Sequence, residues 1–282
     1  MTPLLLDGGM GTALLAAGLP MDALPERWLL ERPDAIAAVH AAHAEAGAEL
    51  VLTCTFNLAA PRLREHGVTI AIESLAARAV ELARRAAPSA RVAGAVGPSG
   101  LAGRASPAEL RERYAEAFRG LAAAGADLLW AESLWDLAEA RAALAAGRAA
   151  GLPVAVTFTF RDGLDGLQAT SGEAGEECLR TAAAEGAAAV GVNCTLPDSA
   201  RALEALVARC AGSLGVPVVA KPSAGLPGSI IPPGAFAACA AELRSAGASW
   251  IGGCCGAAAE HLAAVALRLR GGGGQAPALH TK

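Results

Sequence analysis

The stretch GADLLWAES at residues 125–133 carries the pattern that decides the fold of this chain. A Gly-Ala pair ends a helix-like segment, an apolar run follows at once, and polar side chains stand at the end of the run. Glycine is the usual residue just after the last turn of a helix, where a positive φ is required. The same pattern recurs in AGAELVLTCTF at 46–56, GAAAVGVNC at 186–194 and GASWIGGCC at 247–255. The repeat predicts a helix followed by a strand, four times along the chain.

Four further apolar runs are introduced differently. They are LLLDGG at 4–9, RVAGAVGP at 91–98, PVAVTFTF at 153–160 and PVVAKPSAG at 217–225. Each of the eight candidate strands is followed by an alanine-rich helical segment, which predicts right-handed βαβ units and a parallel sheet. Eight such units in about 270 residues fit a closed (β/α)8 TIM barrel. A doubly wound open sheet is the alternative, but the Gly-x-Gly-x-x-Gly turn expected after its first strand is missing. We predict one α/β barrel domain over residues 1–270 and a flexible tail over 271–282.

The composition limits the kinds of partner that this chain can have. It has 282 residues, of which 54% are hydrophobic and 18% are charged, so it can fill a large core. A net charge of −4 gives no footprint for nucleic acid or for an anionic membrane. The first residues lack the features of a signal peptide, and no apolar run reaches the roughly 20 residues of a membrane span. Seven cysteines are an odd number without the spacing of a secreted disulfide framework. We expect a cytoplasmic protein with reduced thiols and small-molecule partners; assembly into a homo-oligomer is left open.

Polar side chains gather where the candidate strands end. These residues are Asp7, Thr53, Thr55, Asn57, Glu132, Asn193 and Lys221. Barrel active sites are built on the rim formed by the carboxyl ends of the strands. We therefore expect the active site at this rim.

Three cysteines stand at the same rim. Cys194 ends the sixth candidate strand, and Cys254 and Cys255 end the eighth, where flanking glycines permit a turn. In a regular strand neighbouring side chains point apart, so both members of the pair can reach one ion only where the strand gives way to a turn. Three thiolates with an open fourth position suit a catalytic Zn2+ site. The alternative is that these thiols are small buried hydrophobes. That structural role is the one expected for the other cysteines, which are Cys54, Cys178, Cys210 and Cys239.

Two acids at the rim are candidates for binding a zwitterion. Asp7, followed by Gly8 and Gly9, offers a carboxylate to an ammonium group and backbone amides to a carboxylate, and Glu132 is a second ammonium partner. A helix-capping or surface role is the alternative for each acid.

The histidines are weaker candidates. We expect His40 and His43 to be solvated or at the edge of the core, and His261 to be carried away from the rim by the last helix.

The motifs taken together resemble the homocysteine S-methyltransferase family. The family includes S-methylmethionine-dependent enzymes, betaine–homocysteine methyltransferase and the homocysteine module of cobalamin-dependent methionine synthase. The resemblance runs along nearly the whole chain and rests on LDGGMGT at 6–12, TCTFN at 53–57, AVGPSG at 95–100, AESLWDLAEA at 131–140, GVNCT at 191–195, KPSAGLP at 221–227 and IGGCCG at 251–256. GVNC followed by GGCC in this order is highly specific.

The resemblance implies a zinc-dependent methyltransferase. Cys194, Cys254 and Cys255 would bind Zn2+, with the sulfur of homocysteine as the fourth ligand. Asp7 and Glu132 would hold the amino group of the substrate, and backbone around Gly8 and Gly9 would lie near its carboxylate. Four more residues in or near these motifs are expected to contact a substrate, namely Thr55, Asn193, Ser223 and Trp28, the last as part of the donor pocket. A packing role in the first loop is the alternative for Trp28.

The methyl donor follows less directly. Betaine recognition needs an aromatic cage, yet Asn57 and Ser133 stand where the betaine enzymes carry aromatic residues, and the single tyrosine, Tyr114, falls in a helix. The chain also lacks folate and cobalamin modules and the C-terminal extension of the betaine enzymes. These features favour a sulfonium donor, S-methylmethionine or S-adenosylmethionine, with methionine as the product.

Two departures from the family pattern keep alternatives open. Ser223 replaces an asparagine common in relatives, which leaves the resting fourth zinc ligand undefined, and the segment PERWLLERP at 25–33 is unusual. The alternatives are a betaine-dependent enzyme, a methyltransferase for another small thiol or selenol, a non-catalytic zinc-binding or thiol-sensing barrel, and a metal-free enzyme with Cys194 as nucleophile.

Overall fold

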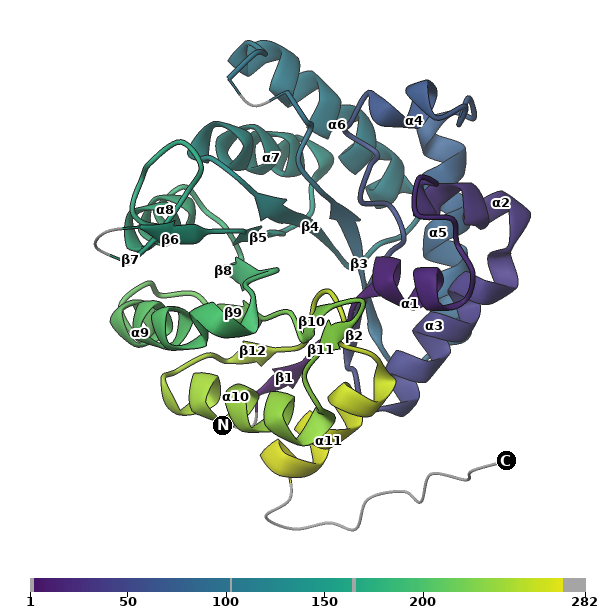
Figure 1. Cartoon of the computed structure of the whole chain (residues 1–282). Coiled ribbons are helices and arrows are strands. Elements are labelled where there is room, and N and C mark those ends of the chain that lie inside the picture. Colours follow the sequence, from purple (N-terminus) through teal and green to yellow (C-terminus); the bar gives the residue numbers. More distant parts are fainter. Residues whose placement is uncertain (1–2, 102, 164–165, 271–282) are drawn as a thin grey trace, which may run out of the picture.

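The computed structural model describes residues 3–101, 103–163 and 166–270, and the predicted tail at 271–282 lies outside the described residues. Eight parallel strands form one sheet in the order β1-β12-β9-β8-β5-β4-β3-β2. A parallel bridge between Leu6 and Leu50 joins the first and last strands of this order, so the sheet closes on itself. Helices surround it on the outside (Figure 1). The predicted (β/α)8 barrel is confirmed.

The described elements follow the predicted alternation. The barrel strands are β1 (Leu4–Leu5), β2 (Leu50–Leu52), β3 (Arg91–Val96), β4 (Leu128–Leu134), β5 (Val154–Phe158), β8 (Ala189–Asn193), β9 (Val218–Lys221) and β12 (Trp250–Ile251). The covering helices are α3 (Pro33–Glu45), α5 (Ile72–Ala86), α6 (Pro107–Ala123), α7 (Leu137–Ala150), α8 (Gly175–Ala184), α9 (Ala200–Cys210), α10 (Pro233–Ser245) and α11 (Ala259–Arg270). Short helices in the connections are α1 (Met10–Ala16), η1 (Pro25–Arg27), α2 (Trp28–Glu31), α4 (Arg62–Glu65) and η2 (Pro197–Ser199). Among the described residues, no helix has the length and apolar character needed to cross a membrane.

The glycines of the repeated pattern lie where the backbone requires them. Gly47, Gly125, Gly186 and Gly247 have φ values of 106°, 88°, 95° and 113°, each just after a covering helix and just before a strand. A side chain with a Cβ rarely adopts this left-handed region. The repeat in the sequence is therefore a series of helix ends at the amino-terminal side of the barrel.

The interior of the barrel is a separate hydrophobic cluster. Its buried members are Leu6, Leu50, Leu52, Ala93, Ala95, Leu128, Trp130, Ala155, Ala189 and Val219. Because side chains alternate along a strand, the residues two positions after Trp130 and Val219, which are Glu132 and Lys221, face the same interior one layer nearer the carboxyl rim. The Lys221 Nζ lies 5.8 Å from the centre of the Trp130 ring. The apolar interior thus ends in a charged layer at the mouth of the barrel.

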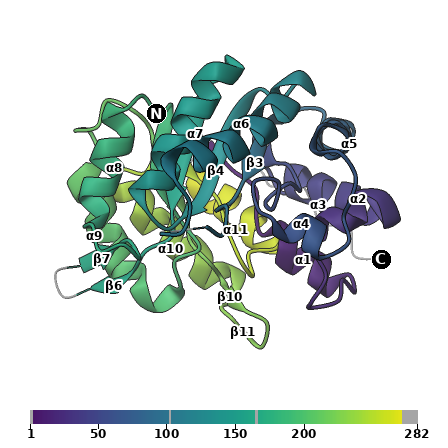
Figure 2. The ribbon, with the colours of Figure 1, turned by 90° about the horizontal axis from the view of Figure 1, so that it is seen from above.

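Two β-hairpins at the carboxyl rim were not predicted from the sequence. β6 (Arg161–Gly163) pairs with β7 (Gly166–Gln168) after β5, and β10 (Gly225–Leu226) pairs with β11 (Ser229–Ile230) after β9. Figure 2 shows both hairpins on the same lower side of the barrel. They extend the loops at the end of the barrel where the charged layer lies.

Candidate metal centre and substrate cavity

Cys194, Cys254 and Cys255 come together at the rim. Their sulfur atoms all lie within 4.8 Å of one another, with 3.1 Å between Cys194 and Cys254 and 3.4 Å between Cys194 and Cys255. Cys194 follows β8 with a left-handed φ of 62°, which turns its side chain away from the strand direction. The pair follows β12 in a turn, so two adjacent side chains reach the same point.

Backbone hydrogen bonds fix the turn that carries the cysteine pair. The Gly253 N–H donates to the Asp7 carbonyl at 2.9 Å, and the Cys254 N–H donates to the Pro222 carbonyl at 2.9 Å. The Gly256 N–H donates to Thr12 Oγ1 at 3.0 Å. The thiols are therefore positioned by the loops after β1 and β9 as well as by their own strand.

The three sulfurs suit a tetrahedral thiophilic metal ion. Zn–S bonds of about 2.3 Å place the sulfurs of a tetrahedral site roughly 3.8 Å apart. The sulfur pairs at 3.1 and 3.4 Å would reach this spacing by moving apart by less than about 1 Å. The contact with the Cys194 thiol, followed by burial, raises the pKa of Cys254 to about 12. At Cys194 and Cys255 one thiol contact lowers the pKa, but the second thiol contact and burial outweigh it, so both pKa values are also raised to about 12. Three thiolates can coexist in this cluster when a cation neutralises them.

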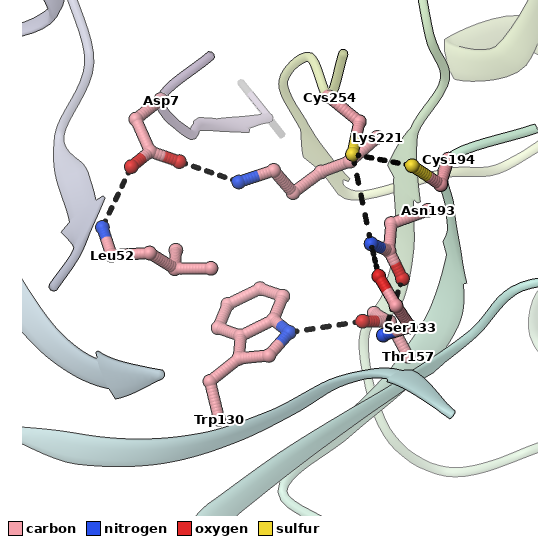
Figure 3. A network of polar contacts seen from close by, with 9 residues as sticks. All are labelled: Asp7, Leu52, Trp130, Ser133, Thr157, Asn193, Cys194, Lys221 and Cys254. Carbon is pink, nitrogen blue, oxygen red and sulfur yellow. Dashed lines mark hydrogen bonds and ion pairs between the residues drawn. The ribbon is translucent and has the colours of Figure 1, made fainter. Parts of the chain in front are cut away.

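Asn193 connects this cluster to β4. Its Oδ1 accepts the Ser133 N–H at 2.9 Å, and its Nδ2 donates to Ser133 Oγ at 2.6 Å and to Cys254 Sγ at 3.7 Å (Figure 3). Ser133 has a φ of 58°, and the pairing register of β4 shifts between Ala131 and Leu134. Asn193 therefore supports both a sulfur of the cysteine cluster and the irregular end of the strand that carries Glu132.

Asp7 and Lys221 form a buried ion pair at the base of the cavity. The Lys221 Nζ lies 2.5 Å from Asp7 Oδ1, and the other carboxylate oxygen accepts the Leu52 N–H at 2.7 Å (Figure 3). Burial alone would lower the pKa of Lys221, but the Asp7 and Glu132 carboxylates outweigh it, so the pKa is raised. The sequence placed Lys221 at the rim without a role; the structure makes it the counter-ion of Asp7.

Glu132, unlike Asp7, has a carboxylate that remains available to bind a ligand in the cavity. Its side chain lines the cavity, and within the described ranges that side chain has neither a hydrogen bond nor an ion pair with another residue. Burial is the main cause that raises the pKa of Glu132 to about 7, with Asp7 and Glu26 adding to it and Lys221 opposing it. A cationic group that entered the cavity would therefore find a carboxylate without a partner.

The cavity has a volume of about 270 Å³ and opens beside the three sulfurs. Of the residues predicted from the sequence, it is lined by Asp7, Gly8, Gly9, Thr55, Glu132, Cys194, Cys254 and Cys255. The predicted contacts Asn193, Ser223 and Trp28 are not among its described lining residues. Trp28 is 5% exposed and packs in the core, with the Arg32 guanidinium carbon 4.9 Å from its ring centre. Ser223 is buried, and its hydroxyl has no partner among the described residues.

Two features of the site were missed or misjudged from the sequence. Glu26, two residues before Trp28, lines the cavity, and its only signal was an acid in the first strand–helix connection. The expectation that His40 and His43 are solvated or at the core edge is wrong, since both are fully buried on α3. Burial lowers the pKa of His40 to about 4 and also lowers the pKa of His43, with the nearby Asp7 opposing both. His261 lies on α11, and its Nε2 is 2.9 Å from the carbonyl oxygen of Ile231, the residue after β11.

The fold and the site define a class: a (β/α)8 barrel with three clustered cysteines that could hold a metal ion, beside an acid-lined cavity at its carboxyl rim. The chain belongs to the homocysteine S-methyltransferase family, whose model matches residues 4–269. Membership confirms the resemblance read from the motifs.

Individual relatives agree with this assignment. The chain is 28% identical to homocysteine S-methyltransferase 1 of Zea mays, covering 94% of each chain. It is 29% identical to methionine synthase of Mycobacterium tuberculosis over 92% of this chain, but spans only 24% of that protein. Among solved structures, the metallated form of the homocysteine methyltransferase MmuM from Escherichia coli superposes with a TM-score of 0.80 at 27% identity, covering 95% of this chain and 96% of that one.

Proposed function

We propose that this protein transfers a methyl group from a sulfonium donor to the sulfur of L-homocysteine, giving methionine, with Zn2+ held by Cys194, Cys254 and Cys255. The observation that carries the proposal is the convergence of three sulfurs within 4.8 Å at the wall of a cavity that also contains an unpartnered acid, Glu132. Bound there, zinc would keep a fourth, incoming sulfur deprotonated at neutral pH.

The residues of the chain supply binding and orientation. Glu132, which has no competing partner in the described chain, would take the ammonium group of homocysteine. Asp7 would contribute through its remaining lone pairs, because Lys221 and the Leu52 N–H occupy only part of its capacity. The Gly9 N–H is already bonded to the Ala257 carbonyl at 3.0 Å, which leaves the neighbouring Gly8 amide for the substrate carboxylate.

The reaction needs no general base at the transfer step. The acceptor sulfur attacks the methyl carbon in line, a new C–S bond forms, and the C–S bond of the donor breaks so that the donor leaves as a neutral thioether. Holding the two substrates in one narrow cavity provides most of the remaining acceleration through orientation and exclusion of water.

A sulfonium donor fits the lining of the cavity better than betaine. Phe56 is the single aromatic among the lining residues that the structure describes, so there is no cage for a quaternary ammonium group. The same lining contains three acids, Asp7, Glu26 and Glu132, against one base, Lys221. Excess negative charge favours S-methylmethionine, which has a net charge of about +1 at neutral pH, over betaine, which is a neutral zwitterion.

The test combines metal analysis with methionine formation. Freshly purified, reduced protein should hold one zinc per chain and convert homocysteine to methionine with S-methylmethionine or S-adenosylmethionine, but not with betaine. Cys254→Ala should lose both zinc and turnover. Cys239→Ala, which changes a partly exposed cysteine on α10 outside the site, should keep both.

Other outcomes would select the alternatives. Turnover by zinc-free protein that depends on Cys194 would favour a metal-free nucleophile. Bound zinc without turnover of any donor, and without binding of homocysteine, would favour a non-catalytic zinc barrel. Turnover with betaine, or preference for another thiol or selenol, would change the substrate but keep the metal centre.

A further inference from the structure

Glu26 is a buried acid in the cavity wall that the transfer of methyl to homocysteine does not use. It lies in the short helix η1, in the connection between β1 and α3, and its side chain is 0% exposed. It nevertheless lines the cavity together with its neighbour Pro25. An ionisable group buried at this depth carries a large desolvation cost unless it is paired or coordinates something.

The hydrogen bonds of Glu26 come from one neutral residue. The Asn57 N–H donates to Glu26 Oε1 at 2.7 Å, and the Asn57 side-chain amide donates to Oε1 at 3.2 Å and to Oε2 at 3.0 Å. These bonds orient the carboxylate but do not neutralise it. No Lys or Arg in the described ranges forms an ion pair with Glu26, and the exposed Arg62 acts on it only weakly. A carboxylate has about four acceptor positions, so one remains beside the three bonds.

The other two acids that line the cavity already have a partner or a role, which leaves the charge of Glu26 without either. Asp7 is paired with Lys221, and Glu132 is left for the acceptor's ammonium group. Glu26 adds to the causes that raise the pKa of Glu132, so the two carboxylates act on each other within the same cavity. A second cation that entered the cavity would therefore stabilise both.

Glu26 and Cys194 line the same cavity from different parts of the barrel. Cys194 follows β8 and the cysteine pair follows β12, which pairs with β1, whereas Glu26 lies in η1 just before α2. Figure 1 shows α2 and β8, and so the Glu26 and Cys194 sides of the rim, on opposite sides of the barrel axis. Asn57 follows β2 and ties the Glu26 side chain to that side. An acceptor held at the sulfurs and at Glu132 leaves the Glu26 side of the cavity for the other substrate.

We propose that Glu26, oriented by Asn57, binds the cationic group of the methyl donor and so determines which donors this protein accepts. The inference rests on the proposed methyl transfer and adds to it the residue that recognises the donor. The cation is either the ammonium group of an amino-acid donor or the sulfonium centre itself. Only in the second case should loss of the Glu26 charge weaken binding of a sulfonium donor that has no amino group.

The test measures the kinetic constants of Glu26→Gln, which keeps the shape and an acceptor oxygen but removes the charge. With S-methylmethionine, the KM for the donor should rise roughly tenfold to a hundredfold, as expected when a charged hydrogen-bond partner is lost. The KM for homocysteine and the zinc content should stay within twofold of wild type. Glu26→Asp should recover part of the donor affinity. Glu139→Gln, which removes a buried acid outside the cavity, should leave the KM for the donor unchanged.

The two sources of positive charge are separated with dimethylsulfonioacetate, which is a sulfonium donor without an amino group. A rise in KM for both donors in Glu26→Gln assigns the sulfonium, and a rise for S-methylmethionine alone assigns the ammonium. Cobalt-substituted protein should show the same change of its thiolate-to-metal absorption on homocysteine binding in Glu26→Gln as in wild type, which verifies a folded acceptor site.

An unchanged donor KM in Glu26→Gln, with both donors, would overturn the inference. That result is distinct from failure of the proposed function, in which the wild-type protein would form no methionine with any sulfonium donor.

Discussion

The side-chain amide of Asn193 holds the backbone of Ser133 in a left-handed conformation. It accepts the Ser133 N–H at 2.9 Å and donates to the Ser133 hydroxyl at 2.6 Å, while Ser133 keeps a φ of 58°. A residue other than glycine in this region costs on the order of 1–3 kcal/mol and persists only where its surroundings enforce it. Because Glu132 immediately precedes Ser133, this bond positions the free carboxylate of the cavity as well as the strand end.

Replacing Asn193 with alanine should therefore damage both the fold and the metal site. We expect Asn193→Ala to lower the free energy of unfolding by about 2–3 kcal/mol, because two buried hydrogen bonds are lost and the Ser133 backbone is left strained. Loss of the amide contact to Cys254 Sγ should weaken zinc binding by roughly 10- to 100-fold. Urea denaturation and competition with a chromogenic chelator measure the two effects.

Ser133→Gly is the matched control for the Asn193 substitution. Glycine adopts the left-handed backbone without strain, so this variant loses only the hydroxyl bond and should be less destabilised than Asn193→Ala. Equal stability of Asn193→Ala and wild type would contradict the role assigned to the amide.

The ion pair between Asp7 and Lys221 predicts a strongly non-additive pair of substitutions. Lys221→Met should lower the free energy of unfolding by about 3–5 kcal/mol, because it leaves a buried carboxylate without its counter-ion. Asp7→Asn combined with Lys221→Met removes both charges and should recover much of that loss. A double-mutant cycle from urea denaturation checks this, and additive effects would show that the two side chains do not depend on each other.

The convergence of Cys194, Cys254 and Cys255 could be predicted from the sequence because their positions follow from local rules. Thiols that directly follow two apolar runs lie at the same rim once the barrel is predicted, and the glycines at 252, 253 and 256 indicated the turn. The contacts that the sequence could not give are long-range. The Asp7–Lys221 pair spans 214 residues, and the Glu26–Asn57 bonds span 31 residues between two irregular loops. His40 and His43 lie on one face of α3, but no periodicity reveals that this face is buried beside Asp7.

The close contact between the first loop and the cysteine loop predicts different effects at two glycines. A Cβ on Gly8 would stand 2.1 Å from the Ala257 carbonyl oxygen and 3.0 Å from His43 Nε2, whereas a Cβ on Gly11 would meet no atom within 4 Å. Gly8→Ala should therefore shift the backbone of the cavity wall and lose homocysteine binding together with stability. Gly11→Ala, within α1, should be neutral or stabilise by about 0.5–1 kcal/mol. Thermal unfolding and homocysteine titration of both variants test this, and a Gly8→Ala variant that behaves like Gly11→Ala would show that the loops are not packed as described.

The raised pKa of Glu132 predicts how stability depends on pH in zinc-free, reduced protein. Burial raises this pKa from 4.5 to about 7, so between these values the folded protein binds more protons at Glu132 than the unfolded chain does. The free energy of unfolding should therefore fall as pH rises through this window, by about 3 kcal/mol in total from this group, and stay level above it. Glu132→Gln cannot ionise, so the advantage of this variant over wild type should appear above pH 4.5 and reach its full size near pH 7. Urea denaturation of both proteins from pH 4.5 to 8 gives the difference directly, since the remaining titrating groups are common to the two. A difference that stays constant across this range would mean that Glu132 is not forced toward its neutral form in the empty cavity.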